Sequence, residues 1–142
     1  MKTLFDTSVI LDARDKTSPW HPWAVAQLTE AVGSGGAVVN PIVLAESSVK
    51  AKDKAAVRAA LEAWGITLVG LPRDAAGPAA EAFSVYLSRL KAEGKEGPRT
   101  PLPDFFIGAH ALAADLPLAT RDPTRFRTYF DAVKLVVPPA AE

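Results

Sequence analysis

The sequence TLFDTSVIL, residues 3–11, decides the fold because it joins an apolar strand to an apolar helix through one acidic residue, Asp6. The run before Asp6 is typical of a buried strand, and the apolar residues after it suit a helix capped by Thr7 or Ser8. Removing a carboxylate from water is costly, so an aspartate at this junction needs a partner or a chemical role.

The rest of the chain repeats this alternation of short apolar strands and longer helices. Strands are predicted at 2–5, 37–39, 66–71, 117–119 and 133–137. Helices are predicted at 20–32, 41–51, 54–64, 74–93 and 104–114, with Asn40-Pro41, Asp53 and Asp122-Pro123 as helix start signals. This order predicts an α/β fold, a three-layer α/β/α sandwich around a parallel sheet of about five strands. We expect a single domain over residues 1–137 and a flexible tail over 138–142.

Composition narrows the classes of function. The 142 residues include 16 basic and 16 acidic side chains, which argues against a uniformly basic nucleic-acid coat but leaves room for a local basic patch. No cysteine is present, which excludes disulfides, thiolate zinc sites and a cysteine nucleophile. The N-terminal segment lacks the pattern of a signal peptide, and no apolar stretch approaches the roughly 20 residues of a membrane span. We therefore expect a cytoplasmic protein that has no membrane partner.

Four acidic residues stand beside predicted strand ends or on the inner faces of helices: Asp6, Glu46, Asp104 and Asp122. Asp6 and Asp122 follow strands, and ligands of open α/β sheets bind beyond the carboxyl ends of the strands. Glu46 lies within the apolar stripe of its helix, where an unpartnered carboxylate is rare. Each acid also has a simpler explanation, because the aspartates can be helix caps and Glu46 can pair with Lys50 or Arg58.

The four acids taken together point to a metal. If they converge in a partly buried pocket, their mutual repulsion has to be relieved by protonation or by a divalent cation. Oxygen ligands without cysteine or a histidine pair suit Mg²⁺ or Mn²⁺.

Four motifs resemble those of the PIN-domain nucleases, and most closely the VapC-like toxins of type II toxin–antitoxin pairs. They are FDTSVIL at 5–11, LAESSV at 44–49, PDFFIGAHAL at 103–112 and ATRDPTRF at 119–126. The resemblance maps the family's catalytic and metal-binding acids onto Asp6, Glu46, Asp104 and Asp122, with Thr7, Ser8 and Thr120 as supporting residues. Gly108 departs from the pattern, since alanine is common at that position.

The resemblance implies an endoribonuclease that uses Mg²⁺ or Mn²⁺ to hydrolyse RNA phosphodiester bonds with a metal-activated water. It also implies a small cognate antitoxin protein as partner, and a homodimer. Basic residues are concentrated between 89 and 134, and Arg99 and Arg121 lie nearest the acids in sequence. These two are our candidates for contacts with RNA phosphates, although for any single one of the basic residues a solvated helix or loop position is the simpler explanation.

Two other classes of function remain open. A catalytically inactive module of the same fold could bind RNA or protein, its acids serving as caps or holding a metal without cleavage. A metal-dependent phosphatase on a similar sheet is the other alternative. The haloacid-dehalogenase type of phosphatase would carry a second aspartate two residues after the first, and Ser8 stands there instead.

Overall fold

Five short parallel strands form the centre of the protein, whose computed structural model describes residues 1–139. The strands pair in the order β3-β2-β1-β4-β5. Their bounds are β1 Thr3–Phe5, β2 Ala37–Val39, β3 Ile66–Leu68, β4 Leu118–Ala119 and β5 Leu135–Val136. The predicted five-stranded parallel α/β fold is confirmed.

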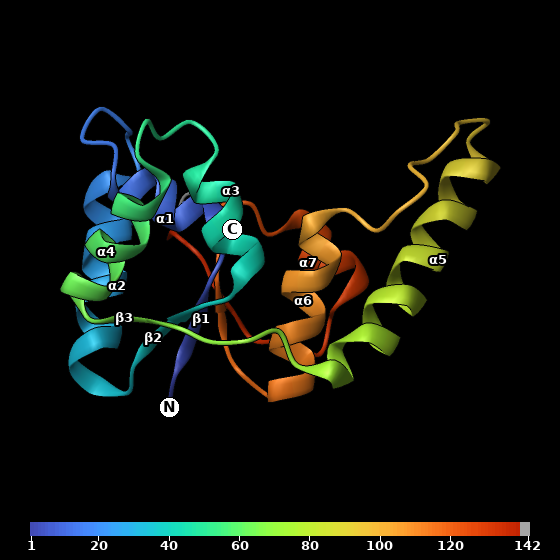
Figure 1. Cartoon of the computed structure of the whole chain (residues 1–142). Coiled ribbons are helices and arrows are strands. Elements are labelled where there is room, and N and C mark those ends of the chain that lie inside the picture. Colours follow the sequence, from blue (N-terminus) through green and yellow to red (C-terminus); the bar gives the residue numbers. More distant parts are fainter. Residues whose placement is uncertain (140–142) are drawn as a thin grey trace.

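Helices flank the sheet on both sides (Figure 1). The first group is α1 Thr7–Ala13, α2 His21–Ser34, α3 Pro41–Ser48 and α4 Lys54–Trp64, and the second group is α5 Ala76–Ala92, α6 Pro103–Ala114 and α7 Thr124–Tyr129. A 3-10 turn, η1 Arg73–Ala75, precedes α5. Figure 1 shows α2 and α4 on one side of the strands and α5 to α7 on the other, with α5 outermost. No helix within residues 1–139 combines the length and the apolar character needed to cross a membrane.

Several predicted elements end earlier or begin later than expected, among them β3, α3 and α5. The strand predicted to reach Leu71 stops at Leu68, because it pairs with β2, which is only three residues long. The helix predicted to reach Ala51 stops at Ser48, where the Lys54 ammonium donates to the carbonyls of residues 48, 49 and 51 and so satisfies the helix end. The helix predicted from Asp74 starts as the 3-10 turn η1 and becomes α-helical at Ala76.

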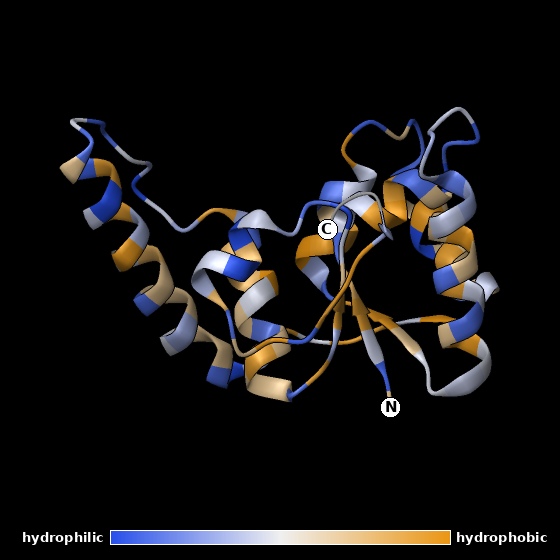
Figure 2. Ribbon diagram, turned by 180° about the vertical axis from the view of Figure 1, so that it is seen from behind, coloured by the Kyte–Doolittle hydropathy of each residue, from blue (hydrophilic) through white to orange (hydrophobic). Residues whose placement is uncertain are grey.

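The core surrounds β1, which is the middle strand of the sheet. Leu4 and Phe5 of β1 and both residues of β4 are buried, as are all three residues of β2. Figure 2 shows these strands as a hydrophobic centre, whereas the loop that follows α5 is hydrophilic. Burial on both faces explains why the strands are runs of apolar residues without alternation.

Gly108 is explained by its contact with Phe130. Gly108 lies in the middle of α6, and a Cβ atom at this position would overlap the buried ring of Phe130. The departure from alanine at this position therefore makes room for that ring.

The order of the strands creates a crevice at the carboxyl end of β1. From β1 the chain proceeds to β2 and β3 on one side, then returns to β4 and β5 on the other. The change of direction lies between β1 and β4, which is where open α/β sheets bind their ligands. Asp6 follows β1 and Thr120 follows β4 at this point. At the other end of the chain, the predicted tail begins with a buried Pro138, and its residues 140–142 lie outside the described residues.

Candidate active site

Asp6 is a buried carboxylate at the junction of β1 and α1, with 5% of its surface exposed. Its Oδ1 accepts from the backbone N–H of Thr7 at 2.8 Å, so Asp6 itself caps α1. The prediction of Thr7 or Ser8 as the cap is wrong, because both residues already lie within the helix. The other oxygen, Oδ2, accepts from the hydroxyls of Ser8 at 3.0 Å and Thr120 at 2.7 Å. Asp6 is therefore a cap and a fixed member of the crevice at the same time.

The electrostatics of Asp6 favour a proton or a cation. Burial raises the pKa of Asp6 from 3.8 to about 6, although the hydrogen bonds from Thr120, Ser8 and Thr7 oppose the shift. The charge of Asp104 raises this pKa further. At neutral pH Asp6 is mostly a carboxylate, and burial makes this charged form unfavourable. A nearby positive charge would offset that cost.

Glu46 reaches the same crevice from α3. Its Oε1 accepts from the Thr7 hydroxyl at 2.6 Å, which ties α3 to the first turn of α1. The alternative ion pair with Lys50 or Arg58 does not form, since Arg58 pairs with Glu62 at 2.9 Å on the exposed face of α4.

Asp104 and Asp122 complete the set, and neither of them caps a helix. Asp104 is the second residue of α6, whose cap position is Leu102, and its Oδ2 lies 3.3 Å from Nη1 of Arg125. Asp122 precedes Pro123, the cap position of α7, and 68% of its side chain is exposed. The backbone N–H of Asp122 donates to Oγ1 of Thr120, the hydroxyl that itself donates to Asp6. The alternative explanation as a helix cap is therefore wrong for Asp104 and Asp122, whereas it holds for Asp6.

The acids form an electrostatically coupled series. Burial raises the pKa of Asp104, the neighbouring Arg125 lowers it, and the charge of Asp122 raises it again. Asp104 thus interacts with Asp6 on one side and with Asp122 on the other. Asp104 and Asp122 also line a cleft of about 660 Å³ between α5 and α7, whereas Asp6 and Glu46 lie outside its lining.

The chemistry of these donors fits a hard divalent cation. Carboxylate and hydroxyl oxygens are the ligands that Mg²⁺ and Mn²⁺ prefer. Burial, and to a lesser extent the charge of a neighbouring acid, raises the pKa values of Asp6 and Asp104, and a cation would offset this cost of the charged forms. Within residues 1–139, no three acidic or histidine side chains are already spaced to hold an ion. Coordination of one ion by three of these side chains at once would therefore need some of them to reorient.

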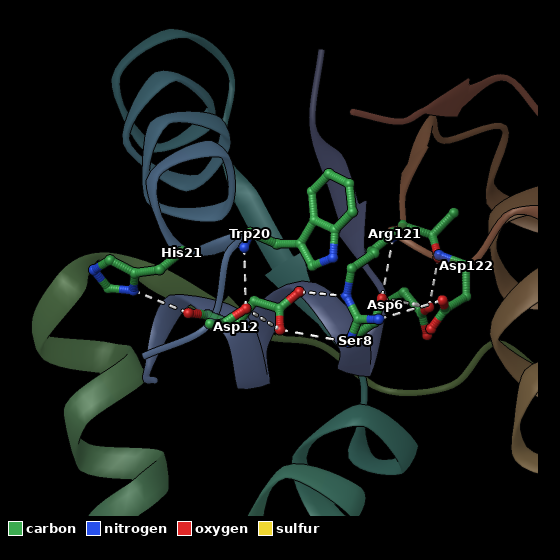
Figure 3. Close-up of polar contacts among 9 residues, drawn as sticks. Asp6, Ser8, Asp12, Trp20, His21, Arg121 and Asp122 are labelled. Atoms are coloured by element: carbon green, nitrogen blue, oxygen red, sulfur yellow. Dashed lines mark hydrogen bonds and ion pairs between the residues drawn. The ribbon is translucent and has the colours of Figure 1, made fainter. Parts of the chain in front are cut away.

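Arg121 has a buried partner that the sequence analysis missed. Its Nε lies 2.6 Å from Oδ2 of Asp12, its Nη2 lies 3.4 Å from Oδ1, and Asp12 is buried on the inner face of α1 (Figure 3). The hydroxyl of Ser18 donates to the same carboxylate at 3.0 Å. The remaining nitrogen, Nη1, lies 3.5 Å from Oδ1 of Asp122. The available signal was the position of Asp12 one turn after Ser8, on the face of α1 that meets the crevice.

Arg99 makes fewer contacts at the site than the sequence analysis predicted, and Arg125 makes more. Arg99 is exposed in the loop between α5 and α6, outside the lining of the cleft, and no hydrogen bond or ion pair involves its side chain among residues 1–139. Arg125, which the sequence analysis did not single out, lines the cleft and pairs with Asp104. Its guanidinium carbon also lies 5.4 Å from the ring centre of Tyr86 and 5.7 Å from that of Phe105, within cation–π range.

Comparisons with known proteins agree with this architecture. The profile of the PIN domain family matches residues 3–130. No curated protein matches the sequence significantly. Among solved structures, VapBC2 from Rickettsia felis bound to a DNA fragment from its promoter is similar, with a TM-score of 0.66, 18% identity and coverage of 97% of this chain and 99% of that chain.

Two further structures show the same fold. FitAcB from Neisseria gonorrhoeae has a TM-score of 0.61 and 24% identity, with 95% of this chain and 96% of that chain covered. A toxin–antitoxin complex from Klebsiella pneumoniae has a TM-score of 0.55 and 22% identity, with 87% and 89% covered. Since the family profile extends from β1 to the residue after α7 and the observed sheet is the one expected for it, this chain belongs to the PIN domain family.

Proposed function

We propose that this protein is a metal-dependent endoribonuclease and the toxin of a toxin–antitoxin pair. The observation that carries the proposal is the buried Asp6 carboxylate in the crevice between β1 and β4, where the strand order changes direction. Asp6 interacts electrostatically with Asp104, and Asp104 interacts with Asp122. Asp104 and Asp122 both line a large cleft. The PIN domain family typically consists of metal-dependent nucleases, which supports the same reaction.

The four acids would hold Mg²⁺ or Mn²⁺, with Asp6, Glu46 and Asp104 as the principal ligands and Asp122 completing the set. When bound, such a cation lowers the pKa of a water that attacks the phosphodiester and balances charge on the phosphate. The supporting hydroxyls keep the acids in place. Thr7 holds Glu46, Ser8 and Thr120 hold Asp6, and Thr120 also receives the backbone N–H of Asp122.

The cations of the site have separate roles in this proposal. Arg125 compensates Asp104 in the metal-free protein and lies where a phosphate entering the cleft would meet it. Arg121 keeps its predicted role as a phosphate contact through Nη1, while Nε and Nη2 fix the loop after β4 to Asp12. The phosphate contact proposed for Arg99 rests on its charge and on its exposed position in the loop before α6.

The proposed partners are RNA, a small antitoxin and a second copy of the chain. The toxin–antitoxin complex from Klebsiella pneumoniae has the fold of this chain, which supports a protein partner of that kind. We also propose that the protein acts in the cytoplasm, where its RNA substrate is found.

The test is cleavage of total RNA by the purified chain, freed of any copurifying protein, with mapping of the RNA ends. The conditions are Mg²⁺ or Mn²⁺, excess EDTA, and the Asp6→Asn variant with metal. Asp53→Asn is the matched control, because Asp53 caps α4 as Asp6 caps α1 but is exposed and is not among the four acids of the candidate site.

We expect discrete metal-dependent cuts that Asp53→Asn retains and Asp6→Asn abolishes. Cleavage that survives EDTA would contradict the metal mechanism. Metal binding without cleavage of any RNA would favour an inactive RNA- or protein-binding module, and release of phosphate from phosphomonoesters would favour a phosphatase.

A further inference from the structure

The lining of the cleft beside the acids includes two chemically different groups. One is Asp104 and Asp122, which we call the acidic end, and the other is Tyr86 and Arg89 of α5 together with Tyr129 of α7, which we call the aromatic end. The proposed reaction uses only the acidic end. The aromatic end therefore has no assigned role.

Arg125 marks the junction between the two ends. It pairs with Asp104 at 3.3 Å, and its guanidinium carbon lies 5.4 Å from the ring centre of Tyr86. The acidic end and the aromatic end are thus within the reach of one side chain. A chain of phosphates and bases that places a phosphate at the acids would place its next base near Tyr86.

The aromatic end is held rigidly by packing. The rings of Tyr86 and Tyr129 meet edge to face, with centroids 5.8 Å apart and planes at 89°. Both rings also pack against Phe105 at 5.3 Å and 5.6 Å, and Phe105 is fully buried. Among residues 1–139, neither tyrosine hydroxyl donates a hydrogen bond within the chain. A half-buried aromatic wall that is fixed before binding loses little conformational freedom when a base packs on it.

A cation lies beside this wall. The side chain of Arg89 is 61% exposed, and the carboxylate of Glu93, the residue that follows α5, is 3.7 Å away. Such an exposed pair is weak, so the guanidinium of Arg89 can contact a phosphate with little competition. Aromatic rings with an adjacent arginine are the combination that binds single-stranded nucleic acid, because every base has a face that stacks.

We propose that Tyr86, Tyr129 and Arg89 form a nucleotide subsite, which we call the α5–α7 subsite. It binds one base of single-stranded RNA next to the phosphodiester at the acids, and Arg89 contacts the adjoining phosphate. The volume of the whole cleft, about 660 Å³, is in the range of pockets that bind ligands of this size. A duplex does not fit this role, since its bases are stacked inside the helix. The inference rests on the proposed ribonuclease function and names the form of RNA that the site accepts.

The test is RNA binding in an Asp6→Asn background, which blocks cleavage and leaves the α5–α7 subsite unchanged. The probes are fluorescent eight-nucleotide oligo(A) and oligo(U) strands, the same strands with one internal abasic position moved along the length, and a duplex. Binding is followed by fluorescence anisotropy with Mg²⁺ present, and thermal melting of each variant shows that it is folded.

Arg89→Ala has a closely matched control in Arg58→Ala. Arg58 also lies on a helix, is 58% exposed and pairs with a glutamate four residues later, but its helix α4 lies at the opposite end of the molecule from α5 (Figure 1). We expect Arg89→Ala to weaken binding of single strands about tenfold and Arg58→Ala to change it less than twofold. Equal effects of the two substitutions would overturn the role of Arg89.

The base contact is tested by combining Tyr86→Leu with the abasic strands. With Tyr86 present, one abasic position should weaken binding about tenfold more than the others, and Tyr86→Leu should remove this difference while Tyr86→Phe keeps it. An abasic effect that is the same with Tyr86 and with Leu would overturn the subsite, as would equally tight binding of the duplex.

Failure of the subsite can be told apart from failure of the proposed function. If the wild-type protein cuts RNA but the two substitutions leave binding unchanged, the α5–α7 subsite is wrong and the nuclease remains. If the wild-type protein neither cuts nor binds RNA, both are wrong.

Discussion

The side-chain amide of Asn40 lies 3.0 Å from Nδ1 of His110, and both residues are buried. Asn40 caps α3 through its Oδ1, which accepts from the N–H of Val43, so its Nδ2 faces the histidine. An amide nitrogen can only donate, so Nδ1 of His110 must be the acceptor and the ring is neutral. This bond connects the start of the helix that carries Glu46 to the middle of the helix that carries Asp104.

Replacing His110 by leucine should destabilise the protein and change its dependence on pH. The Asn40 amide would lose its buried partner, at a cost of about 1–3 kcal/mol. Burial lowers the pKa of His110 below its usual 6.5, so the native state disfavours the charged ring. The contribution of His110 to stability is therefore complete above pH 6.5 and decreases as the pH falls below that value.

Urea unfolding between pH 5 and pH 8 measures both effects. The difference in unfolding free energy between wild type and His110→Leu should shrink toward pH 5. At that pH the histidine of the unfolded wild type is protonated and has to lose its proton on folding, whereas leucine has no such cost. Parallel curves for the two proteins would contradict the buried neutral histidine.

Replacing Asp6 by asparagine should stabilise the metal-free protein at neutral and alkaline pH. The pKa of Asp6 is raised from 3.8 to about 6, so the native state binds a proton more tightly than the unfolded chain does. The contribution of Asp6 to wild-type stability therefore falls as the pH rises from about 4 to 6 and stays reduced above it. The gain for Asp6→Asn above pH 6 is at most about 3 kcal/mol and should disappear near pH 4.

Unfolding curves with EDTA present, recorded at pH 4 and pH 8, check this gain against Asp53→Asn. The control should show little change at either pH, since Asp53 is an exposed cap and asparagine caps equally well. A loss of stability in Asp6→Asn at pH 8 would mean that its role as cap outweighs its charge.

Mg²⁺ should raise the melting temperature of the wild type. The ion would bind the gathered carboxylates of the folded form and not the unfolded chain, so stabilisation follows mass action and reaches about 2.7 kcal/mol at 100 times the dissociation constant. Asp6→Asn should lose most of this shift. A calorimetric scan over a Mg²⁺ series at constant ionic strength is the measurement, and an equal shift in the variant would place the ion elsewhere.

Arg121→Ala should destabilise the protein, because it leaves the buried Asp12 carboxylate with only Ser18 as a side-chain partner. Removing one member of a buried ion pair costs about 3–5 kcal/mol, and the value here should be at the low end since 30% of the Arg121 side chain is exposed. Replacing both residues, Asp12→Leu with Arg121→Met, should recover much of the loss. Chemical denaturation of Asp12→Leu, Arg121→Met and the double variant completes the cycle, and additive losses would show that the pair is uncoupled.

Gly108→Ala should destabilise the protein by about 1–3 kcal/mol, because the new methyl group overlaps the ring of Phe130. In a Phe130→Leu background the same substitution should cost less, since the ring is absent. Thermal melts of the four proteins test this, and an equal cost in both backgrounds would mean that Phe130 is not the obstacle.

The sequence predicts most of the fold because its signals are local. Asn40-Pro41 and Asp53 mark helix starts through backbone hydrogen bonding and conformation, and the structure confirms both. Errors arose where the outcome depends on strand pairing or on contacts of a long side chain. The length of β3 is set by its pairing with β2, and α3 ends where the Lys54 side chain bonds to the carbonyl of Ser48.

The positions of the acids beside predicted strands and helices identify them in the sequence. The side chains that pair with the site residues could not be identified in this way. Arg121 and Asp12 are 109 residues apart in sequence, and nothing local indicates that the arginine is already engaged. The same limit applies to Arg125, whose contacts with Asp104 and with two rings arise only when α5, α6 and α7 pack together.

The hydrogen bond from Thr120 to Asp6 joins residues 114 positions apart and also has a meaning for synthesis. A ribosome makes β1 well before β4, its neighbour in the sheet. The crevice that holds Asp6 therefore cannot close on a growing chain that stops short of β4, and the acidic centre assembles only after β4 has been synthesised. A protein that cuts RNA would thereby remain inactive toward its own message while the part that encodes the segment from β1 to β4 is being translated.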